Sequence, residues 1–166
     1  MRWLVDGYNV IRRDPALSSH EREGLEAGRV ALLHLLAVVA QTSPDTFTVV
    51  FDGARRTGGM ASGGRIEVIF SRPPDRADDV LVRLAARWRD GAVVVTSDRA
   101  VRDAARRAGA AVLGAEEFLA AVTSPPGENV REGEDGEAVR REKRGNPRRA
   151  SKAARAAARA RRRLRR

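Results

Sequence analysis

Short runs of β-branched and aromatic residues alternate with longer segments of helical periodicity along the first 122 residues of this 166-residue chain. The runs predict five strands, at 2–6, 46–51, 65–70, 92–96 and 111–113. The segments between and after them predict helices at 19–41, 76–89, 99–108 and 115–122. Helices of this length form right-handed crossovers between parallel strands. We therefore expect a doubly wound α/β domain, with a mostly parallel sheet of about five strands and helices on both faces.

Capping signals set the ends of two of these helices. Ser18 and Ser19 are candidate N-caps for the long helix at 19–41, and the sequence Ser43-Pro44-Asp45 ends it. Asp75 is the candidate N-cap of the helix at 76–89. The glycine-rich segment at 53–64 has the composition of a loop.

The charge of the chain changes sharply beyond residue 122. The total is +10, but residues 1–122 carry only +1, residues 123–137 carry −4 and residues 138–166 carry +13. We therefore divide the chain into a folded domain at 1–122, a flexible linker at 123–147 and an Arg/Ala-rich tail at 148–166. Alanine and arginine favour a helix, whereas repulsion between closely spaced arginines opposes it. We expect the tail to be disordered when free and helical when bound to phosphates.

Composition excludes several classes of protein. The chain has no cysteine, so disulfides, thiol catalysis and thiolate metal sites are excluded. No apolar stretch approaches the ~18 residues of a membrane span, and no basic segment with a long apolar core opens the chain. We expect a cytoplasmic protein without a membrane partner, and the sequence leaves its oligomeric state open.

Aspartates follow three of the predicted strands. Asp6, Asp52 and Asp98 each come at a strand end, and the carboxyl ends of parallel strands meet at the edge of the sheet where ligands bind. Asn9 and Ser97 lie at the same edge. Carboxylates gathered there would repel one another, which indicates a counter-ion.

The predicted helix at 76–89 adds a second group of acids. Asp75, Asp78 and Asp79 would share one face of its first turn. Each of them also has a structural explanation, because N-capping accounts for Asp75 and the helix dipole for Asp78 or Asp79. Oxygen ligands without histidine or cysteine favour Mg²⁺ or Mn²⁺, which typically act on phosphates. The acidic residues together predict hydrolysis of a phosphodiester.

The run Leu4-Val5-Asp6-Gly7-Tyr8-Asn9-Val10-Ile11 resembles the signature of NYN domains, a branch of the PIN-like metal-dependent ribonucleases. Four later segments resemble the YacP-like subgroup of that family in the same order: 49–53, 66–71, 77–78 and 96–98. The resemblance covers nearly all of residues 2–122 and none of the tail. It implies a PIN-like sheet, dependence on Mg²⁺ or Mn²⁺ and endonucleolytic cleavage of RNA, and some members are linked to ribosome-bound mRNA.

The resemblance also assigns roles to residues. It implies that Asp6, Asp78 and Asp98 bind the metal and that Asn9 completes the catalytic set. In this assignment Asp79 is an accessory carboxylate, and Asp52 lies further from the metal than the other acids. Where some relatives carry a fourth acid, this chain has Arg102, with Asp103 one residue away.

RNA contacts are expected from the pocket, the glycine-rich loop and the tail. The candidates are Tyr8, Ser97, Arg55, Arg56, Arg65, Arg148, Arg149, Lys152, Arg155, Arg159, Arg161, Arg162 and Arg163. A solvated loop explains the loop arginines equally well. The leading hypothesis is a metal-dependent endoribonuclease, and the alternative is a non-catalytic RNA- or ribosome-binding protein with a nuclease-like fold.

Overall fold

A single parallel sheet organises the computed structural model, which describes residues 1–53, 64–123 and 152–164. The strands are β1 (Arg2–Asp6), β2 (Thr46–Phe51), β3 (Ile66–Phe70), β4 (Ala92–Val95) and β5 (Ala111–Leu113), in the spatial order β3-β2-β1-β4-β5. All four neighbouring pairs are parallel. The predicted α/β sheet is thus confirmed, and its strand ends differ from the prediction by at most one residue.

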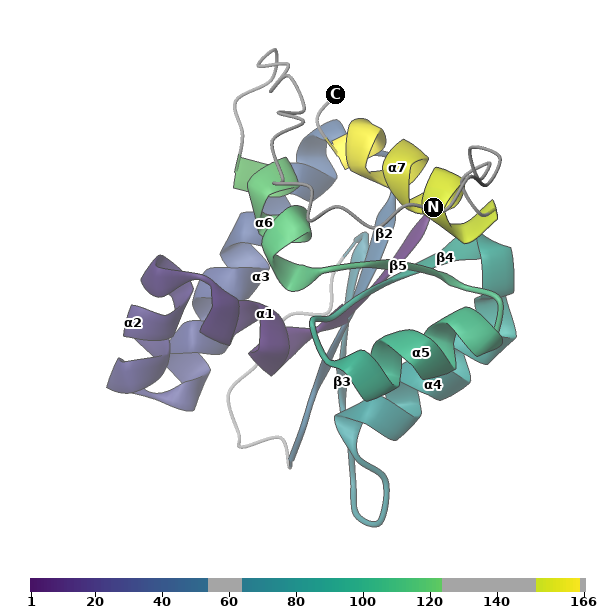
Figure 1. Cartoon of the computed structure of the whole chain (residues 1–166). Helices are drawn as coiled ribbons and strands as arrows, with labels where there is room; N and C mark the ends of the chain where they lie inside the picture. Colours follow the sequence, from purple (N-terminus) through teal and green to yellow (C-terminus); the bar gives the residue numbers. More distant parts are fainter. Residues whose placement is uncertain (54–63, 124–151, 165–166) are drawn as a thin grey trace, which may run out of the picture.

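The winding of the sheet reverses between β1 and β4. From β1 the chain proceeds outward to β2 and β3, and then returns to the other side of β1 to form β4 and β5 (Figure 1). Loops at the carboxyl ends of β1 and β4 therefore diverge and leave a crevice, where ligands of open α/β sheets bind.

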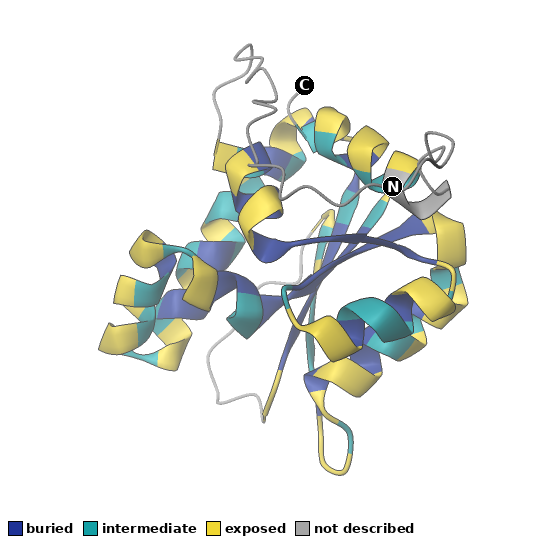
Figure 2. Ribbon diagram, viewed as in Figure 1, coloured by how far each residue is buried: buried dark blue, intermediate teal, exposed yellow. Residues whose placement is uncertain are grey.

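Helices cover both faces of the sheet, and the buried strands lie between them (Figure 2). One face carries α1 (Gly7–Arg13), α2 (Pro15–Glu23), α3 (Leu25–Thr42), α6 (Ala115–Thr123) and α7 (Lys152–Leu164). The other face carries α4 (Ala77–Trp88) and α5 (Arg99–Arg107), and a short 3₁₀ turn, η1 (Arg89–Gly91), precedes β4. Alternation along β1 serves both faces, because Trp3 and Val5 join the first core and Leu4 joins the second.

The prediction of one long helix at 19–41 is wrong, because three helices connect β1 to β2. Asp14 caps α2 by accepting a hydrogen bond from the backbone N–H of Leu17, and Pro15 occupies the first turn. Ser18 and Ser19 therefore lie inside α2 and cap nothing. Gly24, with a φ of 155°, separates α2 from α3. The end of α3 at Ser43 agrees with the prediction.

Helix α3 also changes the expectation about apolar stretches. It has 18 residues and is, within the described part of the chain, the one helix long and apolar enough to cross a membrane by length and composition. Leu32 and Leu36 of α3 are fully buried in the core that faces β1 and β2. Packing against the sheet therefore explains part of its apolar composition, while Leu25, Val30 and Val38 of the same helix are exposed.

The described part of the predicted tail is a helix packed on the domain. Helix α7 contacts β5 and α6, and Ala160 is fully buried there. Nε of Arg163 lies 2.7 Å from Oδ1 of Asp45, at the start of β2. The sequence predicts a helix that forms on binding phosphates, and in the structure α7 packs on the domain through Ala160 and pairs with Asp45 through Arg163. The predicted linker lies almost entirely outside the described residues.

Candidate active site at the carboxyl edge of the sheet

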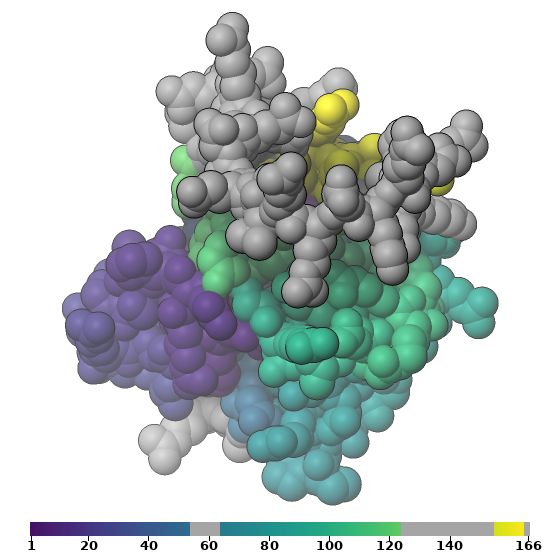
Figure 3. Space-filling model, viewed as in Figure 1, coloured from purple at the N-terminus to yellow at the C-terminus, as the bar shows by residue number. Residues whose placement is uncertain are grey.

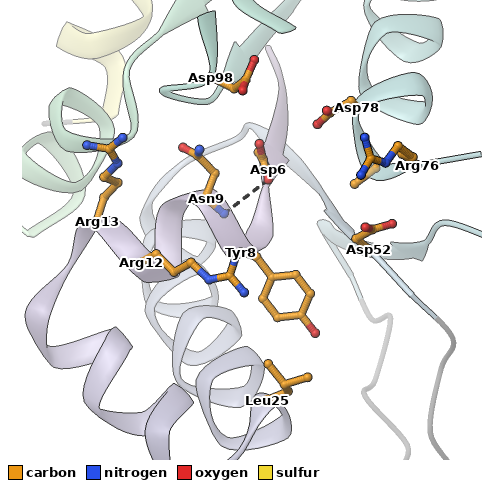
Figure 4. Close-up of a pocket in the computed structure, with 11 residues that line it drawn as sticks. Asp6, Tyr8, Asn9, Arg12, Arg13, Leu25, Asp52, Arg76, Asp78 and Asp98 are labelled. Carbon is orange, nitrogen blue, oxygen red and sulfur yellow. Dashed lines mark hydrogen bonds between the residues drawn. The ribbon is translucent and has the colours of Figure 1, made fainter. Parts of the chain in front are cut away.

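A pocket of about 540 Å³ opens where the winding of the sheet reverses. It collects side chains from the ends of β1 and β2, from α1, from the start of α4 and from the loop after β4 (Figure 4). The predicted site residues that line it are Asp6, Tyr8, Asn9, Asp52, Asp78 and Asp98. The structure therefore brings together most of the acids that the strand ends and the family resemblance indicated.

Asp6 is the most enclosed of these acids, with 8% of its surface exposed. Its Oδ1 accepts a hydrogen bond from the backbone N–H of Asn9 at 3.3 Å, and its Oδ2 accepts one from Oγ1 of Thr96 at 2.8 Å. Burial raises the pKa of Asp6 to about 6, against the opposing effect of the two hydrogen bonds. The nearby carboxylates of Asp78 and Asp98 add to the rise.

The hydroxyl group of Thr96 links Asp6 to the backbone of Asp98. Thr96 is fully buried at the end of β4, and its hydroxyl donates to Asp6 while accepting a hydrogen bond from the backbone N–H of Asp98 at 3.1 Å. Asp98 itself caps α5, because its Oδ1 accepts from the backbone N–H of Val101 at 3.0 Å. One hydroxyl thus fixes the spacing between the carboxyl end of β1 and the start of α5. The sequence pattern carries no signal for this role of Thr96, because a single threonine after a strand has many structural explanations.

The acids at the start of α4 have separate functions. Asp78 lines the pocket, and burial raises the pKa of its carboxyl group, with the Asp98 carboxylate as the next cause. Asp79 instead accepts a hydrogen bond from the backbone N–H of Arg76 at 2.9 Å, which caps the helix. Asp75 pairs with Arg83 at 2.6 Å. The predicted shared face and the N-cap role of Asp75 are therefore wrong, since Arg76 occupies the N-cap position.

Asn9 is held by a polar network that reaches α6. Its Oδ1 accepts a hydrogen bond from the backbone N–H of Ser97 at 2.8 Å. Oγ of Ser97 donates to Glu116 at 2.6 Å, and this hydrogen bond is the main reason that the pKa of Glu116 is lowered. Glu116 also pairs with Arg13 at 3.0 Å. Figure 3 shows the purple N-terminal helices against the green segment, and the Arg13–Glu116 pair joins α1 to α6.

Asp52 and Tyr8 form the side of the pocket near β2. Oδ1 of Asp52 accepts a hydrogen bond from Oγ of Ser71 at 2.6 Å, which ties the end of β2 to the end of β3. The Tyr8 ring packs edge-on against Phe51, with ring centroids 5.2 Å apart. Tyr8 is thereby held at the wall of the pocket.

The donor set fits a hard divalent cation. Carboxylate oxygens are the preferred ligands of Mg²⁺ and Mn²⁺, and a cation would offset the repulsion that adds to the rise that burial causes in the pKa values of Asp6 and Asp78. Within the described residues, no three acidic or histidine side chains are already grouped closely enough to hold an ion. Asp6, Asp78 and Asp98 line one pocket and are the residues that would hold such a cation.

Other predicted RNA contacts lie away from this pocket. Arg65, just before β3, donates to the backbone carbonyls of Ala40 and Ser43 at the opposite edge of the sheet. Arg155, Arg159 and Arg162 of α7 line a separate cavity of about 450 Å³. Arg161 lies 3.7 Å from Glu117, and Arg163 pairs with Asp45. Lys152 begins α7, while Arg55, Arg56, Arg148 and Arg149 fall outside the described residues.

An all-parallel five-stranded sheet with acids collected at its switch point defines an open α/β domain with an acidic ligand-binding pocket. The model of the YacP-like NYN domain family matches residues 3–164, and the chain belongs to that family. The match includes α7, so it extends beyond the region in which the sequence resemblance was recognised. The family is nuclease-like and related to RNA, and nucleases of this kind typically use divalent metals.

Two kinds of relative agree with this assignment. The chain is 33% identical over 85 residues to the uncharacterized protein YacP of Bacillus subtilis (strain 168), and the match spans about half of each protein, 49%. It also resembles the crystal structure of Rae1 (YacP) from Bacillus subtilis, with a TM-score of 0.64 and 31% identity over 74% of this chain and 73% of that one. The W164L mutant of Rae1 gives a TM-score of 0.61 and 30% identity over 74% of each chain.

Proposed function

We propose that this protein is an endoribonuclease that hydrolyses RNA phosphodiester bonds with the help of Mg²⁺ or Mn²⁺. The observation that carries the proposal is the convergence of Asp6, Asp78 and Asp98, from three separate segments, on one pocket at the switch point of the sheet. Such a cation would offset charge on the scissile phosphate and lower the pKa of an attacking water molecule.

The residues of the chain have distinct roles in this proposal. Asp6, Asp78 and Asp98 hold the cation, and Thr96 keeps Asp6 and the start of α5 at a fixed spacing. The Oδ1 atom of Asn9 is engaged by Ser97, so the amide NH₂ group of Asn9 is directed to a phosphate oxygen. Asn9 thus contributes a donor without adding negative charge to the pocket.

Helix α7 supplies a second cationic surface. The exposed arginines Arg155, Arg159 and Arg162 lie on one side of it and bind RNA phosphates through charge. The RNA is either messenger or ribosomal, and ribosome-associated mRNA is the substrate suggested by the family resemblance. A cytoplasmic location, where such RNA occurs, belongs to the same proposal.

The test is cleavage of a single-stranded RNA by three variants, Asp6→Asn, Asp78→Asn and Asp98→Asn. Each should remain folded and lose Mg²⁺- or Mn²⁺-dependent cleavage by at least about 100-fold, because each loses charge that holds the cation. Asp90→Asn is the matched control, since Asp90 is an exposed acid of η1 that does not line the pocket. Cleavage that survives all three substitutions would contradict the assignment.

A second function, RNA binding without catalysis, is favoured by one observation. Arg76 lines the pocket beside Asp78, and its charge partly opposes the rise in the pKa of Asp78 that burial and the Asp98 carboxylate cause, as expected for a cation that partly replaces a metal. A non-catalytic protein would bind RNA with a steep salt dependence, show no heat of Mg²⁺ or Mn²⁺ binding in calorimetry and leave the RNA intact. Metal binding that disappears in Asp78→Asn would exclude this function.

A further inference from the structure

Two arginines at the end of α1 line the acidic pocket although they cannot ligate a metal. Arg12 and Arg13 follow Asn9 by about one helical turn and lie on the same side of the pocket (Figure 4). Cations beside carboxylates weaken the attraction of the carboxylates for a metal ion. Their place in the pocket suits an anionic ligand that binds beside the acids.

The charge of the pocket agrees with such a ligand. Four carboxylates and three arginines, including Arg76, are among the described residues that line it. One bound divalent cation thus changes the formal charge of the lining from −1 to +1. A pocket that becomes cationic on loading a metal favours a polyanion over a neutral substrate.

Both guanidinium groups are oriented yet accessible. Arg12 forms a two-pronged ion pair with Glu21, with Nε at 3.2 Å and Nη2 at 3.1 Å from Oε1, and it lies 5.3 Å from the centre of the Tyr8 ring. Arg13 pairs with Glu116 at 3.0 Å. The side chains of Arg12 and Arg13 are 63% and 51% exposed. The Arg13–Glu116 pair is exposed on both sides, so phosphate can replace Glu116 at small cost. The side chain of Glu21 is only 15% exposed and orients Arg12, whose remaining N–H groups can still donate to phosphate.

The cations flank the carboxylates from two sides. Figure 4 shows Arg12 and Arg13 on α1 on one side of Asp6, and Arg76 at the start of α4 on the other. A polyanionic strand bound to both sides would cross the acids, with its ends free to continue. This arrangement matches an internal segment of RNA better than a chain end.

The wall next to Arg12 also fits an unpaired base. The Tyr8 ring is half-buried and held by Phe51, and Leu25, which is 52% exposed, lies below it in Figure 4. Bases of single-stranded RNA stack on such aromatic platforms, whereas paired bases in a duplex do not present their faces.

From these observations the geometry points to a strand-binding subsite beside the metal-binding acids. Arg12 and Arg13 bind consecutive backbone phosphates of single-stranded RNA on one side of the scissile phosphate, and Tyr8 stacks on the intervening base. This inference rests on the proposed nuclease function for the position of the scissile phosphate, but the binding of RNA by these side chains can be measured separately.

The test measures binding of a short, labelled single-stranded RNA to the full chain by fluorescence anisotropy over a range of salt, in an Asp98→Asn background that prevents cleavage. Arg12→Ala and Arg13→Ala should each weaken binding and reduce the slope of log K against log salt by about 0.7. Two matched controls should change neither quantity. Arg83→Ala removes an arginine that is 62% exposed and paired with Asp75, and Arg106→Ala one that is 47% exposed and paired with Asp103.

A glutamate variant separates phosphate binding from a merely structural ion pair. Glu21→Gln breaks the same pair as Arg12→Ala but keeps the cation. It should bind RNA as tightly as the parent or more tightly, because a competing anion is removed. Equal weakening by Glu21→Gln and Arg12→Ala would overturn the subsite.

Chemical substitution of the RNA locates the contact. The reagents are RNAs in which one phosphate at a time is replaced by a neutral methylphosphonate. At one position the replacement should weaken binding to the parent protein but should not weaken binding to Arg12→Ala any further. Absence of such coupling at every position, or failure of the parent to bind the RNA, overturns the inference. Cleavage by the wild-type chain without coupling would reject the subsite and keep the nuclease. Coupling without cleavage would keep the subsite and reject the nuclease function.

Discussion

At the scale of one residue, the buried carboxyl group of Asp6 shows how the site lowers the stability of the folded chain. The carboxyl group is buried, accepts two hydrogen bonds and faces two other acids. The hydrogen bonds favour the charged form, but burial and the neighbouring carboxylates outweigh them and raise its pKa from 3.8 to about 6. The folded chain therefore holds an ionised carboxylate at neutral pH in a place that disfavours it.

A dependence of stability on pH follows. Because the folded-state pKa of Asp6 lies above its unfolded value, its contribution to stability is fully present below pH 3.8 and is lost as pH rises through about 6. In chelator, the free energy of unfolding of the wild type should fall relative to that of Asp6→Asn by up to about 3 kcal/mol between acidic and neutral pH. Urea denaturation across this range, with Asp103→Asn as control, measures it. Parallel pH profiles for wild type and Asp6→Asn would contradict it.

Gly7 is the second position at which one residue decides the site. A Cβ atom there would lie 2.2 Å from the Phe51 ring, so α1 can start directly after β1 only because the position has no side chain. Gly7→Ala should lower the free energy of unfolding by about 1–3 kcal/mol through overpacking. Gly91→Ala is the matched control, because a Cβ at Gly91 meets nothing within 4 Å. Equal midpoints in urea for the two variants would show that Phe51 moves aside without cost.

At the scale of elements, the first crossover shows what periodicity cannot reveal. Helix α1 has seven residues and follows β1 with no intervening turn, so its apolar positions, Val10 and Ile11, are too few to form a repeating pattern. The signal for α2 was present as Asp14-Pro15, which the apolar spacing of the longer helix outweighed in the prediction. Yet α1 carries Tyr8, Asn9 and two of the three arginines that line the pocket, so the missed element is the one that shapes the site.

Helix α7 depends on a buried carboxylate that joins three parts of the chain. Asp45 is fully buried and contacts the amine of Met1 at 2.9 Å, Nε1 of Trp3 at 3.0 Å and Nε of Arg163 at 2.7 Å. Burial acts to raise the pKa of Asp45, but the hydrogen bonds from Trp3 and the amine, together with the two positive charges, lower it. Figure 1 shows α7 beside the N-terminus, as these contacts require.

Loss of one partner should loosen α7 selectively. Arg163→Ala should lower the free energy of unfolding by about 1–2 kcal/mol and speed amide hydrogen exchange in α7, because it removes a charged donor from Asp45. Arg162→Ala removes an exposed arginine from the next position and should change neither. If exchange in α7 is equally fast in both variants, packing of Ala160 holds the helix without the ion pair.

At the scale of the whole molecule, charge is divided between two surfaces. The acidic pocket lies at the carboxyl edge of the sheet, and no described residue of α7 lines it. The exposed arginines of α7 line a different cavity. RNA bound at both places would be long enough to span them, with α7 supplying affinity and the pocket supplying chemistry.

This division predicts separable effects on binding and cleavage. Changing Arg155, Arg159 and Arg162 together to Gln should reduce the salt slope of RNA binding by roughly 2 units and leave the cleavage rate at saturating RNA unchanged. The control is a second triple variant that removes the same charge from other helices by changing Arg22, Arg83 and Arg106 to Gln. Substitution is preferable to deletion of residues 138–166, which would also expose the core around Ala160. An equal loss of slope in both triple variants would show that only net charge matters.

The sequence by itself determined the sheet and the edge at which the acids meet. Apolar runs of strand length mark each strand, and parallel crossovers place their carboxyl ends together, so Asp6, Asp52 and Asp98 could be assigned to one edge without coordinates. The family resemblance added Asp78. These inferences succeed because apolar runs and chain direction are local properties that consecutive residues determine.

Only the tertiary structure decided which side chains turn into the pocket. Asp78 lines it, whereas Asp79 caps α4 and Asp75 pairs with Arg83, because the first turn of α4 has one fixed rotation against the sheet. The same holds for Arg12 and Arg13, which reach the acids only because α1 starts at Gly7 without a turn. Rotation and packing of helices depend on contacts between residues far apart in the sequence, and those contacts exist only in the folded chain.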